Sequence, residues 1–450
     1  MNEELPLNRF SSKYKSFLEN KGFHKYGKNT LWLISEKVLR MIFGLLIGVW
    51  VARYLGPEKF GMLSYAISFV ALFSALSTLG LDSIVVRELV KDSKKENIVL
   101  GTAFSLRFIG AIVVLILVTL STFIYSEGYE SDEIILVLAA TTLVQSFSVI
   151  DFYFQSNVKG KYVAISNVIS LLFSSLIKIL LIVSHAGLEF FAYVIFIEMS
   201  ILSISYIYFY VSKGSSILKW SFDKSTALNL LKDSWPLILS SLVVTLYMKV
   251  DQIMINKMIG PESVGYYTAA TRLSEVWYFI PVVICNSLFP AILNAKERSK
   301  ELYLKRLQNL YDFILWLALA IALFVTLISN PLIDILYGKE YASSSSVLLV
   351  HIWSSVFVFL GVASSKWFIA EGLQKQALYR TLAGLGVNVF LNLLLIGSYG
   401  AIGAAIATLL SQIVASYLFN VFSIKTRGMF IMQSKSFLFP VRIFKVIFSK

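Results

Sequence analysis

The stretch "VARYLGPEKFGMLSYA" (51–66) decides the architecture, because a later part of the chain repeats its layout. "LGPEKFGMLSYA" (55–66) aligns with "IGPESVGYYTAA" (259–270) at a constant offset of 204 residues. The identical pairs are Gly56/Gly260, Pro57/Pro261, Glu58/Glu262, Gly61/Gly265 and Ala66/Ala270. Each copy follows a long apolar run, and a Gly-Pro pair ends a helix. The pattern predicts a sharp corner between two helices, formed once in each half of the chain.

A second internal match supports the duplication. "LIKILLI" (176–182) aligns with "FLNLLLI" (390–396) at an offset of 214, which sets Lys178 opposite Asn392. In the same register Glu198 lies opposite Gln412. Both matches pair corresponding apolar segments, so they predict two halves of about six spans each. An even number of spans gives both halves the same orientation in the membrane, as in a parallel repeat.

The composition is that of a polytopic membrane protein. Of 450 residues 57% are hydrophobic and only 15% are charged, and the mean hydropathy is +0.73. A soluble domain carries about a quarter of its residues as charged side chains. We therefore predict an all-α membrane protein with about twelve transmembrane helices. The predicted spans are 31–54, 62–81, 101–125, 133–154, 163–184, 190–211, 235–258, 265–290, 307–329, 344–370, 378–396 and 400–422.

These spans divide the chain into five predicted parts. Residues 1–30 form a basic N-terminal segment, and 31–211 form an N-terminal lobe. A linker, 212–234, leads to a C-terminal lobe, 235–422. A basic tail, 423–450, mixes aromatic and cationic side chains and is typical of an anchor lying in the membrane interface.

The distribution of lysine and arginine predicts the topology. The N-terminal segment, the tail and alternate loops hold most of these residues, whereas the remaining loops hold only Lys59 and Lys339. Basic loops stay in the cytoplasm, so both termini are expected there. The net charge of +13 is explained by contact with anionic lipid, not with nucleic acid.

Chemistry that depends on a cofactor has no support in the sequence. The single cysteine, Cys285, allows no disulfide within the chain and no cysteine-rich metal site. No GxxxxGK[ST] phosphate loop is present to bind ATP. The predicted outer loops are too short to hold an enzyme domain. These features favour a transporter, channel or scaffold over an enzyme, and we expect no cofactor.

Three blocks of the sequence resemble Wzx-type polysaccharide (O-antigen) flippases of the multidrug/oligosaccharidyl-lipid/polysaccharide (MOP) exporter superfamily. They are "EKVLRMIFGLLIGVWVARYLGPEKFGMLSYAISFVALFSALSTLGLDSIVVREL" (36–89), "YMKVDQIMINKMIGPESVGYYTAATRLSEVWYFIP" (247–281) and "GLGVNVFLNLLLIGSYGAIGAAIATLLSQ" (384–412). The resemblance implies a fold like that of MATE transporters, with two six-helix lobes around a central cavity. It also implies that the substrate is an undecaprenyl-diphosphate-linked O-antigen or capsule repeat unit, flipped from the inner to the outer leaflet. Other polysaccharide assembly proteins are possible partners.

Charged side chains within the predicted spans are the candidates for function, because a charge near the bilayer centre costs several kcal/mol. Arg40 shares one helical face with Glu36, Gly44 and Gly48. This face is either a cavity wall with an anion-binding arginine or a Glu36–Arg40 pair beside a glycine packing seam. Lys249 has no partner on its own helix, which favours a functional role for it.

The other intramembrane charges are candidates either for structural ion pairs or for function. Lys178 and Glu198 either form one structural ion pair or leave Glu198 as a proton or sodium coupling site. Arg272 has Glu275 three residues further on, which favours pairing. Arg53 is expected at the outer end of the first span, as a secondary candidate for substrate release.

We predict that Arg40 and Lys249 bind the diphosphate, with support from Arg272, Lys178 and Arg53. Asp251 or Glu198 would couple transport to an ion gradient, and the two lobes would rock in alternating access. Two other functions remain open. One is a small-molecule or drug antiporter of the same superfamily, and the other is a non-transporting scaffold for glycan assembly.

Overall fold

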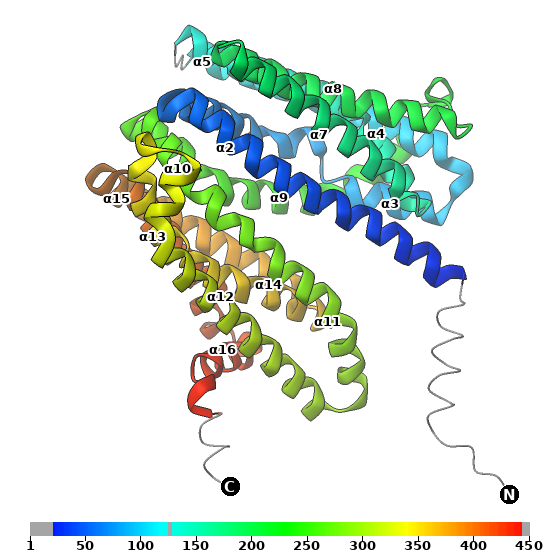
Figure 1. Ribbon diagram of the computed structural model, residues 1–450. Coiled ribbons are helices and arrows are strands. Elements are labelled where there is room, and N and C mark those ends of the chain that lie inside the picture. The colour runs from blue at the N-terminus through cyan, green and yellow to red at the C-terminus, as the bar shows by residue number, and fades with distance from the viewer. Residues whose placement is uncertain (1–20, 125–127, 443–450) are drawn as a thin grey trace, which may run out of the picture. The chain divides into compact units, whose positions relative to one another are not determined.

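The computed structural model describes residues 21–124 and 128–442 (Figure 1). Within these ranges every regular element is a helix. The chain forms two compact units, each built from two segments. Unit 1 comprises Met1–Gly48 and Phe73–Leu239, and unit 2 comprises Val49–Leu72 and Ser240–Lys450. The division of the chain into sequence halves at the linker stays a prediction.

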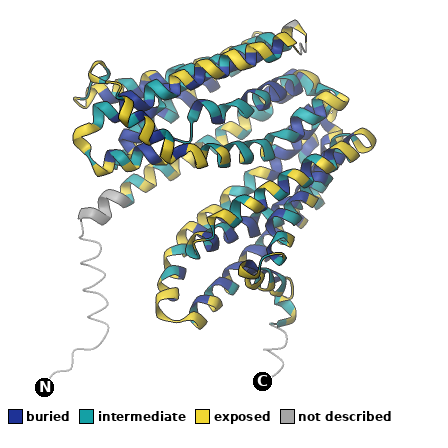
Figure 2. Ribbon diagram, turned by 180° about the vertical axis from the view of Figure 1, so that it is seen from behind, coloured by how far each residue is buried: buried dark blue, intermediate teal, exposed yellow. Residues whose placement is uncertain are grey.

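The long helices carry large apolar side chains on their exposed surfaces, as in a protein surrounded by lipid. Phe123 and Leu327 are 89% and 73% exposed, and Figure 2 shows exposed residues along the helices of both units. In the described part of the chain, nine helices are long and apolar enough to cross a membrane. A further helix pair, bent by 46°, would make ten. The all-helical membrane fold is confirmed.

Two helices reverse at a glycine, which bears on the number of spans. α2 (Lys21–Thr78) contains Gly56 at φ 72°, and α15 (Gln374–Ser416) contains Gly400 at φ 59°. These left-handed conformations carry almost no steric cost in glycine. The reversals lie where the first predicted span meets the second and the eleventh meets the twelfth. The count of twelve spans stays a prediction.

Unit 1 contains the first part of α2, the start of α9 (Lys224–Ile259) and the helices between them. Those helices are α3 (Asp82–Lys91), η1 (Ser93–Lys95), α4 (Glu96–Ile124), α5 (Tyr129–Gln145), η2 (Ser146–Ser148), α6 (Val149–Ser156), α7 (Gly160–Val183), α8 (Leu188–Ser212) and η3 (Ile217–Lys219). Its core joins α3, α4, α6 and α8 through buried residues such as Leu81, Leu100, Phe154 and Tyr210. The α7 and α8 helices pack along each other (Figure 1).

The predicted linker packs against unit 1. A Cβ on Gly101 of α4 would lie 2.6 Å from the backbone of Ser221, so only glycine permits this approach. The Trp220 indole donates to the Tyr210 hydroxyl over 3.1 Å. Asp223 then begins α9 as a helix cap, because its Oδ2 accepts from both the backbone and the hydroxyl of Thr226 at 2.7 Å. These hydrogen bonds from Thr226 lower the pKa of Asp223.

Unit 2 contains the middle of α2, the rest of α9 and the remaining helices. These are α10 (Pro261–Glu275), η4 (Val276–Tyr278), α11 (Phe279–Arg298), α12 (Lys300–Leu336), η5 (Lys339–Tyr341), α13 (Ala342–His351), α14 (Ser354–Ala370), α15, η6 (Leu418–Val421) and α16 (Ile424–Phe437). The α12 helix packs against α11, α13, α14 and α16.

The two repeated corners meet within unit 2. A Cβ on Gly61 would lie 1.8 Å from the Pro261 carbonyl oxygen, and a Cβ on Gly265 would lie 2.0 Å from the Pro57 carbonyl oxygen. Each glycine therefore lies directly against the backbone of the other copy. No side chain fits at either position, which explains why both copies of the motif have glycine there.

Tyr341 contacts both corners. Its hydroxyl donates to the Ala52 carbonyl over 2.7 Å. Its ring meets the rings of Phe60 and Tyr266 edge to face, both with centroids 6.3 Å away. These contacts join α2, α10 and η5 into one packed corner.

The basic tail begins as α16, which unit 2 buries along one face. Thr426, Met429, Gln433 and Ser436 recur every three or four residues and are all buried. Gln433 donates to Ser364 and to the Ser416 carbonyl at 2.9 and 3.1 Å. Beyond the helix Arg442 binds both carboxylate oxygens of Asp312, at 2.6 and 2.7 Å.

Candidate functional site

Arg40 pairs with Glu36 on the same face of α2 in unit 1. Arg40 Nε donates to Glu36 Oε1 over 2.8 Å. The Glu36 side chain is 7% exposed, whereas that of Arg40 is 42% exposed. The pair that the spacing allowed is therefore formed. The accessible guanidinium is still free to meet a second anion with its remaining donors.

Lys178 of α7 and Glu198 of α8 also form an ion pair. Lys178 Nζ lies 3.0 Å from Glu198 Oε2, and both side chains are about one-fifth exposed. The backbone at the same position is engaged as well, because the Ser170 hydroxyl donates to the Glu198 carbonyl over 2.5 Å. Each charge thus has its counter-charge within unit 1.

Asp251 of α9 lies in a different environment in unit 2. It is 4% exposed, and its hydrogen-bond donors are all neutral. Tyr267 donates to Oδ2 over 2.5 Å, and the Thr408 hydroxyl makes a short hydrogen bond to the same oxygen. The Asn392 amide donates to Oδ1 over 2.6 Å. The carboxylate is therefore held in place without a cation.

The side chains around Asp251 offer further oxygen ligands. Asn392 Nδ2 also donates to Asn388 Oδ1 over 3.1 Å, while Asn392 Oδ1 is buried without a hydrogen-bond partner. Carboxylate, amide and hydroxyl oxygens together are the ligands that small hard cations prefer. A buried acceptor without a donor is costly, and a cation beside Asp251 would satisfy it. We call Asp251, Tyr267, Asn388, Asn392 and Thr408 the Asp251 cluster.

Charge alone does not reveal most of this cluster. Intramembrane charge points to Asp251 but not to Tyr267, Asn388 or Thr408, which are neutral. A signal was present in the spacing, because Gly384, Asn388 and Asn392 recur every fourth residue of α15 and share one face. The approach of Tyr267 from α10 depends on tertiary packing and has no such signal.

A polar layer of neutral groups extends from the cluster. The rings of Tyr267 and His351 meet edge to face with centroids 5.9 Å apart. His351 Nδ1 lies 2.6 Å from the Ser274 hydroxyl. The Tyr247 hydroxyl forms a hydrogen bond with the Ser411 hydroxyl over 3.1 Å. The histidine serves packing here, and in the described part of the chain no three His, Cys, Asp or Glu side chains gather as for a metal ion.

Lys249 and Arg272 share one acid in unit 2. Both are half-buried, and both interact electrostatically with Glu275 of α10. The Arg272 guanidinium also lies over the Phe60 ring, 4.8 Å from its centroid. Asp251 interacts with Glu275 as well, so two cations and two carboxylates lie in this region, and the two cations offer donors to a phosphate. Phosphate groups bind strongly to such clusters.

Arg53 lies apart from that cluster. It belongs to the stretch of α2 just before the Gly56 corner and is exposed. A Cβ on Gly338 would lie 3.8 Å from Arg53 Nε, so the guanidinium is beside the turn into η5. Unit 2 thus gathers Lys249, Arg272 and Asp251 near Glu275, whereas Arg40, Lys178 and Glu198 belong to unit 1.

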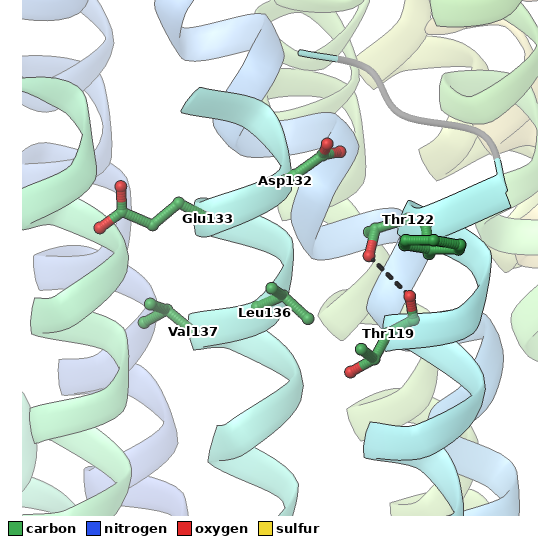
Figure 3. A pocket seen from close by; sticks show the side chains of 7 residues that line it. Thr119, Thr122, Asp132, Glu133, Leu136 and Val137 are labelled. Carbon is green, nitrogen blue, oxygen red and sulfur yellow. Dashed lines mark hydrogen bonds between the residues drawn. The ribbon is translucent and has the colours of Figure 1, made fainter. Parts of the chain in front are cut away.

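The α4 and α5 helices enclose a cavity of about 520 Å³ in unit 1 (Figure 3). Its lining includes Thr119, Thr122, Asp132 and Glu133 but none of the predicted site residues. Figure 3 shows Asp132 and Glu133 pointing in different directions. Glu133 accepts from the Tyr193 hydroxyl over 2.9 Å, so its carboxylate is engaged outside the cavity. We assign no function to this cavity.

Known families match the sequence over most of its length. The model of a family described as "Polysaccharide biosynthesis protein" matches residues 26–296. A second model, described as "MatE", matches residues 236–394. The first match covers more than half of the chain and contains both copies of the repeated corner.

Similar proteins are found in bacteria. The capsular polysaccharide biosynthesis protein CapF of Staphylococcus aureus is 22% identical, over 86% of this chain and 96% of its own. A putative O-antigen transporter of Shigella flexneri is 23% identical, over 84% of this chain and 93% of its own. The lipid II flippase MurJ of Bacillus subtilis is 22% identical, over 87% of this chain and 83% of its own.

Solved structures share the fold. An inward-facing multidrug resistance MATE family transporter of the MOP superfamily aligns with a TM-score of 0.70 at 16% identity, over 88% of this chain and 96% of that one. The lipid II flippase MurJ in an inward closed conformation aligns with a TM-score of 0.65 at 16% identity, over 93% of each chain. The predicted resemblance to a MATE-like fold is confirmed.

Proposed function

Because the chain belongs to the polysaccharide biosynthesis protein family, we propose that it is a transporter that flips a lipid-linked oligosaccharide across the membrane. The names of its relatives, a putative O-antigen transporter and a lipid II flippase among them, support this class. In our proposal the substrate is an undecaprenyl-diphosphate-linked repeat unit of O-antigen or capsule. It moves from the inner to the outer leaflet by alternating access.

The observation that carries the proposal is that two cations, Lys249 and Arg272, lie near each other within unit 2. Both cations face one carboxylate, Glu275, and cationic side chains away from bulk water bind phosphate oxygens strongly. We propose that they bind the diphosphate of the substrate. Arg40, Lys178 and Arg53 keep their predicted supporting roles as hypotheses. Arg40 and Lys178 both form ion pairs, and the Arg40 side chain is the more exposed of the two.

We further propose that the coupling cation binds at Asp251 and not at Glu198. Glu198 already has the Lys178 ammonium 3.0 Å away, so a second cation would have to displace it. Asp251 has only neutral donors, and the free Asn392 Oδ1 lies in the same cluster. A sodium ion or a proton is the cation of this hypothesis.

The proposed location is the cytoplasmic membrane of a bacterium, with both termini in the cytoplasm. The excess of lysine and arginine in the N-terminal segment, the tail and alternate loops supports this topology. Other proteins of polysaccharide assembly are proposed partners.

Reconstitution tests the transport proposal directly. The protein would be placed in liposomes with a fluorescent undecaprenyl-diphosphate oligosaccharide, and flipping measured by protection from a membrane-impermeant quencher. Lys249→Ala should lower the rate by roughly tenfold or more, the effect of losing one charge-assisted contact. Lys425→Ala is the matched control, because Lys425 is exposed.

The alternatives predict different results in the same assay. A scaffold would give no protein-dependent flipping with the unmodified chain. A drug antiporter would exchange small cations for protons or sodium but leave the lipid-linked sugar in its leaflet. If Lys249→Ala and the control flip the substrate at equal rates, Lys249 does not bind the diphosphate. The proposal that the protein is a transporter would be unaffected.

A further inference from the structure

A small basic cavity lies where α2 and α7 begin, in unit 1. Its volume is about 180 Å³, and its lining residues are Lys28, Asn29, Trp32, Val158 and Lys161. None of the substrate or coupling residues discussed above belongs to it. We call it the Lys28 pocket.

Tight backbone packing fixes the shape of the Lys28 pocket. The Gly160 amide donates to Asn29 Oδ1 over 2.5 Å. A Cβ on residue 160 would lie 2.7 Å from that oxygen and 3.1 Å from the Leu33 side chain. The start of α7 therefore lies close against these α2 side chains. Val158, two residues before Gly160, has φ 56°, a conformation that a β-branched residue adopts only when its surroundings enforce it.

The pocket has an excess of positive charge. Two of its five lining residues are lysines and none is acidic. Among the ion pairs that the described residues form, none involves Lys28 or Lys161. Lys161 instead lies over the Trp32 ring, 5.7 Å from its centroid. Both ammonium groups are therefore available to an anion.

The surroundings are those of a membrane interface. Trp32 is exposed, and tryptophan gathers at the headgroup level. Its neighbours Leu31 and Ile34 are 66% and 48% exposed, as side chains that meet lipid are. The lysine distribution predicts that this end of α2 faces the cytoplasm, where the anionic leaflet lies.

The basic surface continues around the pocket with the same pairing of lysine and aromatic ring. Lys159 lies over the Tyr153 ring, with its Nζ 4.9 Å from the centroid. Lys213 lies over the Tyr162 ring at 5.0 Å. In each pair the ammonium group itself lies over the aromatic ring, as in a cation–π contact.

We propose that the Lys28 pocket binds the phosphate of an anionic phospholipid such as phosphatidylglycerol. Lys28 and Lys161 would hold the phosphate oxygens, and Trp32 would lie beside the glycerol and the first carbons of the chains. The pocket is open to the surface, and its volume of about 180 Å³ can hold a phosphate and a glycerol. The bound lipid would fix α2 to α7 at the inner surface.

Native mass spectrometry of the full chain tests this proposal. The protein would be purified from bilayers of phosphatidylcholine and phosphatidylglycerol in equal amounts, and the retained lipids counted and titrated. The doubly substituted Lys28→Gln/Lys161→Gln protein should bind phosphatidylglycerol roughly 20- to 30-fold more weakly, from the loss of two lysines at an anionic surface. Lys91→Gln/Lys94→Gln, two exposed lysines on the same predicted side, should bind as the unmodified chain does.

Several outcomes would overturn the proposal. If the protein retains as much phosphatidylcholine as phosphatidylglycerol, the pocket does not select an anionic lipid. If both double variants lose phosphatidylglycerol equally, the lysines attract the leaflet only through their charge and not through a site. Displacement of the lipid by inorganic phosphate would indicate a site for soluble anions. Displacement by undecaprenyl diphosphate at equal concentration would assign the pocket to the substrate. If the glutamine variant fails to elute as one species, Lys28→Arg/Lys161→Arg replaces it and should retain the lipid.

Discussion

The Lys178–Glu198 pair of unit 1 and the Asp251 cluster of unit 2 hold a carboxylate in different ways, and one position of the repeat, Lys178 opposite Asn392, belongs to both. Lys178 aligns with Asn392, and Glu198 aligns with Gln412. In unit 1 the acid is neutralised by the lysine 3.0 Å away. In unit 2 the lysine is replaced by an amide that donates to Asp251. One half thus has a closed ion pair, and the other has an acid without a cation.

This difference indicates where a mobile cation can bind. An ion pair in a low-dielectric site is satisfied and has no need for a further ligand. A carboxylate with neutral donors keeps its charge available to a cation. Our hypothesis therefore places cation coupling at Asp251 in unit 2 and not at the ion pair of unit 1.

The largest effect is expected from Asp251→Asn. The change removes the only carboxylate of the Asp251 cluster, so coupled transport should fall on the order of 100-fold, from the loss of about 3 kcal/mol of charged contact. Glu198→Gln is the matched control and should transport at a rate near that of the unmodified chain. Flipping in liposomes with and without a sodium or proton gradient measures both. A gradient response that is lost in Glu198→Gln and kept in Asp251→Asn would reverse the comparison.

Asn392→Lys would place a lysine beside Asp251 in unit 2, as Lys178 lies beside Glu198 in unit 1. The new ammonium group should pair with Asp251 and displace the coupling cation, which we expect to weaken cation binding by one to two orders of magnitude, or about 1.4 to 2.8 kcal/mol. Isothermal titration of sodium into the purified protein measures this affinity. Asn392→Gln serves as a neutral control, and equal affinities of the two variants would argue against binding at Asp251.

Breaking the unit 1 pair should change stability more than transport. Lys178→Met leaves Glu198 without its counter-charge, at a cost on the order of 3 kcal/mol. The double substitution Lys178→Met/Glu198→Leu should recover most of that loss, because neither charge then remains. Thermal unfolding in detergent separates the single from the double variant. Loss of flipping in a stable double variant would show that the pair has a transport role.

The smallest effect is expected from Gln412→Ala. Gln412 aligns with Glu198, but its Oε1 only accepts from the Ser416 hydroxyl at 3.5 Å. The change should alter the free energy of unfolding by less than about 0.5 kcal/mol and leave sodium affinity as it was. A large loss of affinity in the titration would mean that the cation site extends along α15 to this residue.

Much of the fold could be predicted from residue patterns because lipid imposes simple rules. Apolar segments, glycine corners and the internal repeat predicted an all-helical membrane protein, and the resemblance to the MOP superfamily implied its MATE-like fold. The Lys178–Glu198 and Glu36–Arg40 pairs were anticipated as alternatives from spacing and register. The neutral members of the Asp251 cluster were not, since Tyr267 and Thr408 reach the acid only through packing between α9, α10 and α15. Hydrogen-bond partners of this kind leave no charge signal in the sequence.

The contact between the corners explains why the duplication can still be read in this chain. Gly61 and Gly265 each lie against a proline carbonyl of the other copy, so the contact depends on backbone and not on side-chain identity. Elsewhere the halves can diverge by exchanging one apolar side chain for another. A change at either glycine would separate both copies at once. The two glycines therefore constrain each other, and the record of an ancestral duplication persists where the two copies touch.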